Sequence, residues 1–140
     1  MTRSALVRLS NDLRLTCMRI SRRVRVESDR ELPPNQFSVL ARLEDGHLTN
    51  GELAEVESVS APSMTRMTSC LVEAGYVDRS VDPNDGRQVF LSLTTEGRRA
   101  LGRVRRHRDE WMLERFDALT DDEQRLLLRA QEVLAKVASQ

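Results

Sequence analysis

Two short segments of alternating apolar residues, joined by a dense turn signal, constrain the fold of this chain most strongly. Residues 77–81 alternate with a period of two, as do residues 89–93. Between them, positions 83–86 read Pro-Asn-Asp-Gly, four residue types that favour turns. Period-two alternation on both sides of a turn predicts a β-hairpin with a long loop.

A pair of short helices is predicted immediately before the hairpin. Thr49 is suited to cap the first helix, because Glu52 follows three residues later as in a capping box. After a turn at 58–60, Pro62 lies in the first turn of the second helix and Gly75 follows its end. The apolar stripe of this second helix comprises Met64, Met67, Leu71 and Ala74.

Longer helices are predicted on both sides of this segment. Residues 5–27 repeat apolar side chains at helical spacing, and the Pro33-Pro34 pair opens a further helix that ends at Gly46. Thr94 or Thr95 begins a helix that reaches about residue 116, and Thr120 begins the last, which runs to about residue 138. Because only 4% of the residues are aromatic, the core must be mainly aliphatic, which favours helices over a β-sandwich.

The order of these elements predicts one domain over residues 1–140, mainly α with a small β-hairpin wing. Two short helices followed at once by a hairpin form a winged helix-turn-helix, here a DNA-binding lobe at 33–93. The helices at 3–30 and 95–138 carry apolar faces that one small lobe cannot cover, and we expect them to form a dimer. The residues that need partners in the last helix are Leu126, Leu127, Val133, Leu134 and Val137.

The second short helix has the character of a helix that enters a major groove. Its outward residues are small and hydroxyl-bearing apart from Arg66, and no acid occurs between positions 58 and 72. The formal net charge of the chain is +0, yet residues 58–108 contain nine Arg against five acids. The alternative interpretation of this face is an ordinary solvated helix surface.

The hairpin loop offers a second contact. Arg87 follows Asp85 by two residues, so that the carboxylate can hold the guanidinium extended for a narrow minor groove. The alternative is a surface ion pair worth less than about 1 kcal/mol.

Several other classes of protein are disfavoured. Neither a membrane-spanning apolar segment nor a signal peptide is recognisable, and we expect a cytoplasmic protein without membrane association. Cys17, Cys70, His47 and His107 show no metal-ligand spacing, and no nucleophile–base motif or phosphate loop occurs. We therefore expect no enzyme activity, no metal and no cofactor.

Four stretches of the sequence resemble one known family. They read Ser-Ala-Pro-Ser-Met-Thr-Arg at 60–66, Leu-Val-Glu-Ala-Gly-Tyr-Val-Asp-Arg at 71–79, Asp-Pro-Asn-Asp-Gly-Arg at 82–87 and Leu-Ser-Leu-Thr-Thr-Glu-Gly at 91–97. The first two are similar to the recognition region of MarR-type (multiple antibiotic resistance regulator) transcription factors. The last two are similar to the wing signature of that family, D-P-x-D-x-R followed by L-T-x-x-G.

The resemblance implies a homodimeric, sequence-specific transcriptional regulator, expected to be a repressor, on a pseudo-palindromic double-stranded operator. It also implies release by a small anionic or aromatic effector, whose binding residues the sequence leaves unknown. Arg79 is left open between a structural role and a backbone contact, and Asp85 is expected to position Arg87. The residues that the resemblance places at the DNA are Ser60, Ala61, Pro62, Ser63, Thr65, Arg66, Ser69, Arg79, Asp85 and Arg87.

One alternative function remains open. A winged-helix domain whose basic face has been turned to protein partners has the same pattern of helices and hairpin. Such a protein–protein interaction module would bind no specific DNA and would not depend on Arg66 and Arg87.

Overall fold

The computed structural model describes residues 1–28 and 31–139. Residues 29 and 30, within the region 3–30 predicted to dimerise, lie outside the described residues. The described part contains the elements α1 (Arg3–Ser28), α2 (Pro34–Arg42), β1 (His47–Thr49), α3 (Asn50–Val56), α4 (Ala61–Glu73), β2 (Val77–Val81), β3 (Val89–Leu93), α5 (Thr95–Phe116) and α6 (Asp121–Ala138).

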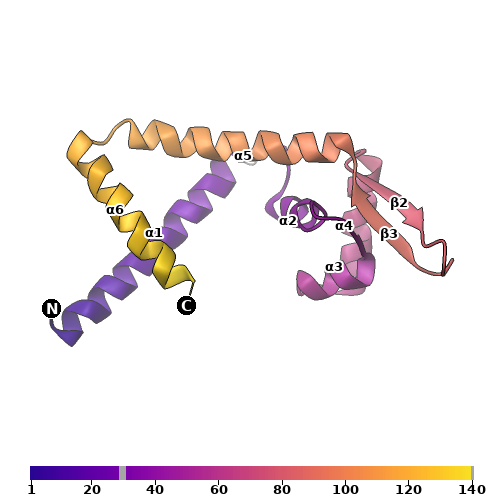
Figure 1. Cartoon of the computed structure of the whole chain (residues 1–140), viewed down its shortest axis with the longest axis horizontal. Helices are drawn as coiled ribbons and strands as arrows, with labels where there is room; N and C mark the ends of the chain where they lie inside the picture. The colour runs from indigo at the N-terminus through magenta and orange to yellow at the C-terminus, as the bar shows by residue number, and fades with distance from the viewer. Residues whose placement is uncertain (29–30, 140) are drawn as a thin grey trace.

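Helix α5 is the long axis of the molecule (Figure 1). The short helices α2, α3 and α4 and the β2–β3 hairpin gather at the N-terminal end of α5, whereas α1 and α6 lie towards its C-terminal end. Helix α1 packs against α5, and α5 also contacts α2 and β3. The structure therefore has a compact lobe with a hairpin wing at one end and two extended helices at the other.

Side-chain caps fix the starts of the helices where the sequence predicts them. Thr49 and Glu52 form a reciprocal capping box at α3, with the Glu52 amide donating to Thr49 Oγ1 over 3.2 Å. Thr120 and Glu123 form a second capping box at α6. Thr94 caps α5, since the Gly97 amide donates to its Oγ1 over 2.9 Å. Each cap supplies an acceptor for an amide that has no partner within its helix.

The sheet has one strand more than the sequence predicts. The hairpin of β2 and β3 is confirmed, with Val77 opposite Leu93 and Val81 opposite Val89. Strand β1 pairs with the other edge of β3, giving the antiparallel order β1-β3-β2. The helix predicted to end at Gly46 ends at Arg42 instead, which leaves the chain free to turn into β1.

A single aliphatic core holds the lobe together. Every residue of this cluster lies between Leu32 and Val104, so the core joins the winged lobe to the first half of α5. Leu40, Leu53, Met64, Leu71 and Leu91 are fully buried within it. Ala74, predicted to belong to the apolar stripe of α4, is exposed because the helix ends there.

The terminal helices bury little within the chain. None of the residues of α6 is buried, and its Leu126 and Leu128 are 59% and 70% exposed. Leu6, Val7 and Met18 of α1 are likewise exposed. Among the described residues, no helix combines the length and the apolar character needed to span a membrane.

Candidate nucleic-acid interface

Helix α4 is anchored on one side so that its other side faces outward. Met64 and Leu71 are fully buried in the core, and Thr68 between them is buried as well. The Thr68 hydroxyl donates to Asn50 Oδ1 of α3 over 2.8 Å and approaches the Met64 carbonyl oxygen at 3.0 Å. This polar link between the two short helices is absent from the sequence prediction, because a Thr–Asn contact 18 residues apart leaves no local pattern.

The outward side of α4 carries five of the predicted DNA-contacting residues. Ser60 caps the helix, accepting from the Ser63 amide over 3.3 Å and donating to Ser63 Oγ over 2.9 Å. The exposed residues of the first turn and of the outward face of α4 are Ala61, Pro62, Ser63, Thr65 and Arg66. The first turn of α4 therefore presents small side chains and one cation to solvent.

Arg79 reaches α4 from the neighbouring strand. Its Nη2 donates to Ser69 Oγ over 2.9 Å, and Ser69 is half-buried. The bond joins β2 to α4, as the structural interpretation of Arg79 predicts. The remaining guanidinium donors of Arg79 stay at the exposed surface of strand β2.

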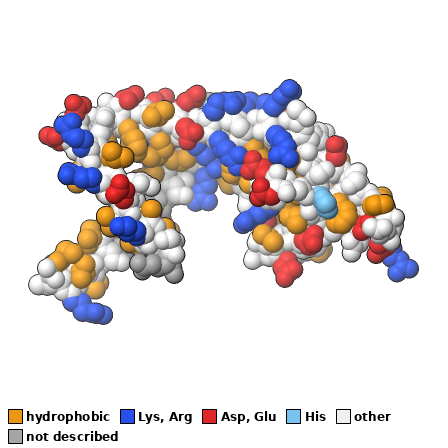
Figure 2. All heavy atoms as spheres, in the orientation of Figure 1, with side chains coloured by type: hydrophobic (Ala, Val, Ile, Leu, Met, Phe, Trp, Pro, Cys, Tyr) orange, Lys and Arg blue, Asp and Glu red, His pale blue; other side chains and the backbone are white. Residues whose placement is uncertain are grey.

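The loop between β2 and β3 is ordered by its own acids. Asp82 Oδ1 accepts from the Asn84 amide over 2.8 Å, and Asp85 Oδ1 accepts from the Arg87 amide over 3.0 Å. The structure thus gives Asp85 a hold on the Arg87 backbone rather than on its guanidinium. Arg87 is the only Lys or Arg in the loop, and a basic side chain stands at the far end of the wing in Figure 2.

The four arginines of the winged lobe differ in what holds their side chains. Arg42 forms an ion pair with Glu57 at 2.8 Å, and Arg79 is bonded to Ser69. For the guanidiniums of Arg66 and Arg87, the described residues provide no hydrogen bond or ion pair. Two cations without internal partners, one on α4 and one at the wing tip, are available for an external anion.

An ion-pair network holds the base of the wing to α5. Glu31 accepts from Arg103 Nε and Nη2, at 3.0 Å and 2.6 Å, and Arg103 Nη2 also donates to Glu96 over 2.8 Å. The hydroxyl of Tyr76, which lies between α4 and β2, donates to Glu31 Oε1 over 3.4 Å. The bonds from Arg103 hold the pKa of Glu31 below its ordinary value of 4.5 despite the opposing effect of burial.

Backbone contacts fix the same junction. The Thr94 hydroxyl donates to the Gly75 carbonyl oxygen over 2.6 Å, and the Thr94 amide donates to the Tyr76 carbonyl oxygen over 3.1 Å. Gly75 has a φ of 76°, in the left-handed region that glycine adopts at little cost. The end of α4 and the start of α5 are therefore held together, so that recognition helix and wing keep a fixed relation.

The arrangement defines a winged helix-turn-helix. Helices α3 and α4 form the helix-turn-helix, and the β2–β3 hairpin forms the wing (Figure 1). The guanidiniums without internal partners belong to Arg66 on α4 and to Arg87 in the wing loop. Within the described residues, no group of three or more His, Cys, Asp or Glu side chains is placed to hold a metal ion. The site has the chemistry of a surface that binds a polyanion.

Comparison with known proteins assigns the class more closely. The MarR family model matches residues 32–89. An HTH-type transcriptional regulator of Mycobacterium leprae is 37% identical over 132 residues, which cover 93% of this chain and 92% of that protein. The crystal structure of the YusO protein from Bacillus subtilis superposes with a TM-score of 0.77 at 28% identity, covering 99% of both chains.

A third comparison concerns the fold alone. A mutant of MepR from Staphylococcus aureus, bound to an oligodeoxyribonucleotide, matches with a TM-score of 0.71 at 19% identity, covering 92% of this chain and 97% of that one. The chain belongs to the MarR family of winged helix-turn-helix transcriptional regulators.

Proposed function

We propose that this protein acts as a cytoplasmic homodimeric repressor on a pseudo-palindromic operator and is released by a small anionic or aromatic ligand. Residues 33–93 form the DNA-binding lobe, and residues 3–30 and 95–138 form the dimerisation region. In this proposal the protein binds DNA and a small ligand and catalyses no reaction.

The observation that carries the proposal is the pair of guanidiniums without internal partners, on Arg66 and Arg87. A cation at the protein surface that is not committed to a carboxylate can release counterions from a phosphate backbone or bond a base edge. Arg66 extends from the helix that enters the major groove, and Arg87 from the wing, which reaches the adjacent minor groove. Arg79 bonds Ser69 through one guanidinium nitrogen and contacts the DNA backbone with its remaining donors, and Asp85 orders the loop that carries Arg87. The small side chains that line the approach to the DNA are Ser60, Ala61, Pro62, Ser63, Thr65 and Ser69.

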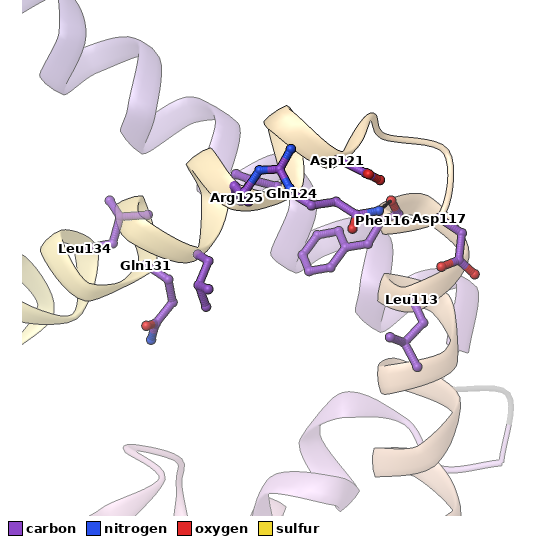
Figure 3. A pocket seen from close by; sticks show the side chains of 10 residues that line it. Leu113, Phe116, Asp117, Asp121, Gln124, Arg125, Gln131 and Leu134 are labelled. Carbon is purple, nitrogen blue, oxygen red and sulfur yellow. Dashed lines mark hydrogen bonds between the residues drawn. The ribbon is translucent and has the colours of Figure 1, made fainter.

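The dimer is supported by the apolar groove between α5 and α6. This groove has a volume of about 710 Å³, and Leu113 and Phe116 of α5 and Leu134 of α6 are among the side chains that line it (Figure 3). Exposed apolar surface often marks a site that binds another protein. The exposed apolar residues of α1 in a second copy provide the cover, and a twofold axis then separates two recognition helices by about one DNA turn, roughly 34–36 Å.

Ligand release is supported by a second, cationic cleft. It has a volume of about 350 Å³ and lies between α1, α2 and α5. It is lined by Arg25, Arg42, Arg108 and Phe37, and the centroid of the Phe37 ring lies 3.9 Å from Arg108 Cζ. The volume falls in the range of about 300–1,000 Å³ typical of ligand sites, and the guanidiniums and the ring suit an aromatic carboxylate.

Fluorescence anisotropy on the DNA upstream of the protein's own gene tests the main claim. A shuffled duplex of equal length is the reference, at about physiological salt. We expect specific binding that Arg66→Ala and Arg87→Ala each weaken by roughly 5- to 150-fold, because a lost base contact costs about 1–3 kcal/mol. Arg106→Ala is the matched control, since it removes one exposed cation of α5 outside the proposed interface.

The alternative function has its own signature in this experiment. Equal and weak binding to both duplexes, unaffected by either substitution, would favour a winged domain that binds protein partners. A reporter fused to the upstream region tests the sign of regulation: deletion of the gene raises expression for a repressor and lowers it for an activator.

A further inference from the structure

One polar residue is buried in the otherwise aliphatic core of the described chain, and it is Thr68 of α4. A buried hydroxyl is costly unless it is hydrogen-bonded. The Met64 carbonyl oxygen, one turn earlier at 3.0 Å, is sufficient to satisfy it. The further bond to Asn50 Oδ1, over 2.8 Å, joins α4 to α3. Its consequence is that the side chain of Asn50 is held in one orientation.

The other end of the Asn50 side chain is free. Asn50 is the first residue of α3 and is half-buried. Its Oδ1 is held by Thr68, whereas the described residues offer no hydrogen-bond partner to its Nδ2. Because no buried side-chain nitrogen or oxygen of the described residues lacks a partner, this Nδ2 is accessible to solvent. Two N–H donors are therefore held in place without an acceptor.

Asn50 adjoins the surface that is proposed to meet DNA. The Thr68 hydroxyl lies 3.2 Å from the Thr65 carbonyl oxygen, and residues three apart lie on the same side of a helix. Thr65 is exposed and belongs to the proposed interface. Helices α3 and α4 are in contact (Figure 1). The Asn50 amide thus borders α4 at the turn that carries Thr65.

Asn50 is also the one residue of α3 suited to bond an anion. Among the residues of α3, all of which the structure describes, it alone has a side chain that can donate a hydrogen bond. The neighbouring acid, Glu52, is turned back towards Thr49, whose amide donates to Glu52 Oε2 over 2.8 Å. A neutral donor on an otherwise acidic or apolar helix can contact a phosphate without a competing ion pair.

We infer that Asn50 donates its side-chain amide to a phosphate of the DNA strand beside the groove that α4 enters, and that Thr68 orients the amide for this bond. Thr68 is a positioning residue, because it acts on DNA through Asn50. Asparagine side chains are among the usual donors to phosphate oxygens, and such contacts fix the register of a protein on DNA. The inference rests on the proposed function and extends the interface from α4 and the wing onto α3.

Asn50→Asp tests the contact in the anisotropy assay. The aspartate keeps an oxygen for Thr68 and is favourable in the first turn of a helix, so stability in urea should not fall. Affinity for DNA is expected to fall at least about tenfold, because a bond to a charged group is lost and a negative charge faces the phosphate. Asn35→Asp is the matched control: it makes the same exchange at an exposed residue in the first turn of α2, outside the proposed interface, and should leave the affinity unchanged.

The salt dependence of binding distinguishes a phosphate contact from a purely structural role of Asn50. In Asn50→Lys an ammonium group replaces the amide, and one more neutralised phosphate makes the slope of log affinity against log salt steeper by about 0.9. Asn35→Lys is the control and should leave the slope unchanged. Because phosphate contacts do not depend on base sequence, the slope is measured on the upstream and on the shuffled duplex.

Two substitutions of Thr68 test its positioning role. Thr68→Val removes the hydroxyl and frees the Asn50 side chain, which must then be ordered on binding, at a cost of about two- to tenfold in affinity. Thr68→Ser keeps the hydroxyl and should retain the affinity. A merely structural role predicts instead that affinity follows the order of stability of the two variants in urea. In Asn50→Ala, Thr68→Val should have no further effect on affinity, since the two residues act as a pair.

The outcomes separate this contact from the proposed function. Unchanged affinity in Asn50→Asp, or an unchanged slope in Asn50→Lys, overturns the contact, while specific binding that Arg66→Ala weakens still upholds the proposed function. A steeper slope in Asn50→Lys on both duplexes, without preference for the upstream one, upholds the contact and refutes specific recognition of that operator. Equal loss of affinity in Thr68→Val and Thr68→Ser overturns the role of Thr68. No binding of the unmodified protein to either duplex refutes both proposals.

Discussion

The residues that follow α3 and α4, Ser58 and Gly75, have the same left-handed backbone conformation, but the conformational energy that it costs differs between them. Ser58 and Gly75 both follow a helix and both have positive φ values, 53° and 76°. The Tyr76 amide donates a hydrogen bond to the Leu71 carbonyl oxygen over 2.9 Å, which closes the Schellman motif of α4 as the Val59 amide closes that of α3. Glycine accepts this conformation freely, whereas serine does so at an energetic cost.

Ser58→Gly is therefore expected to raise the free energy of unfolding. Relief of the left-handed conformation stabilises the folded state by about 1–2 kcal/mol. The greater conformational freedom of glycine in the unfolded chain offsets about 0.4–1 kcal/mol of this stabilisation. We expect a net stabilisation of about 0.5–1 kcal/mol, measured by urea denaturation. Gly75→Ala is the converse control and should lower stability, although a Cβ there meets no atom within 4 Å. Destabilisation by Ser58→Gly would show that its side chain contributes a contact.

At the level of elements, the helix that follows the wing depends on one glycine. A Cβ at Gly97 would overlap the Tyr76 carbonyl oxygen and lie 3.0 Å from Leu93 Cδ2. Because that carbonyl also accepts from the Thr94 amide, it has little freedom to move. The close approach gives a physical reason for glycine at the end of the L-T-x-x-G motif.

Gly97→Ala is expected to lower the free energy of unfolding by about 1–3 kcal/mol, the usual cost of overpacking. Gly102→Ala in the same helix is the control. It should raise stability by up to about 1 kcal/mol, since alanine favours helices and the nearest atom, Arg106 Nη1, is the end of a flexible side chain at 3.6 Å. Equal effects of the two substitutions in thermal or urea unfolding would contradict this explanation.

The elements that the sequence predicts are those with local signals. Capping residues Thr49, Thr94 and Thr120 locate three helix starts, and period-two alternation around a Pro-Asn-Asp-Gly turn locates the hairpin. Strand β1 is missed because three residues are too few to show a period, and its pairing with β3 is decided by tertiary packing.

The candidate site was likewise predictable only where its residues have a local sequence signal. The outward position of Arg66 follows from helical periodicity, and the exposed position of Arg87 follows from its place in the turn between the two strands. The bond between Arg79 and Ser69, and that between Glu57 and Ser38, join residues on different elements and have no local pattern. The sequence interpretation also misassigned the contact of Asp85, because spacing alone does not distinguish a bond to the backbone from one to the side chain.

At the scale of the whole molecule, ion pairs between the lobe and α5 make stability depend on pH. Bonds from arginines hold the pKa values of Glu31 and Glu44 below 4.5, against the opposing effect of burial. A carboxyl whose pKa is lower in the folded state stabilises the fold above its unfolded pKa and ceases to do so as pH falls through the folded value. The protein should therefore lose stability progressively below about pH 4.5.

Glu31→Gln tests this acid dependence. It is expected to lower stability at neutral pH and to flatten the fall in stability between neutral pH and about pH 3, because one titrating contact has been removed. Glu73→Gln, which changes an exposed carboxyl without an ion pair in the described residues, is the control. Urea midpoints measured across the pH range provide the readout, and parallel curves for Glu31→Gln and the unmodified protein would exclude a role for the Glu31–Arg103 pair.

The last prediction concerns the assembly, for which α6 holds the decisive surface. Most of its charged side chains follow one stripe, containing Asp122, Arg125, Arg129 and Lys136, and apolar residues occupy most of the remaining circumference. Leu128 is 70% exposed in the single chain and borders the groove between α5 and α6. Exposed apolar surfaces of this kind commonly mark sites of contact with another protein, and the proposed dimer would cover this one.

Leu128→Glu is therefore expected to shift the protein from dimer to monomer in light scattering coupled to gel filtration. Operator affinity should fall by roughly 100-fold or more, because joining two half-site contacts in one molecule contributes about 10²–10⁴ in avidity. Arg129→Glu is a stringent control: it adds more negative charge one residue away, on the polar stripe, so an effect of charge alone would be larger there. A dimer that survives Leu128→Glu would move the interface away from this groove, whereas monomers that retain full operator affinity would remove the need for twofold recognition.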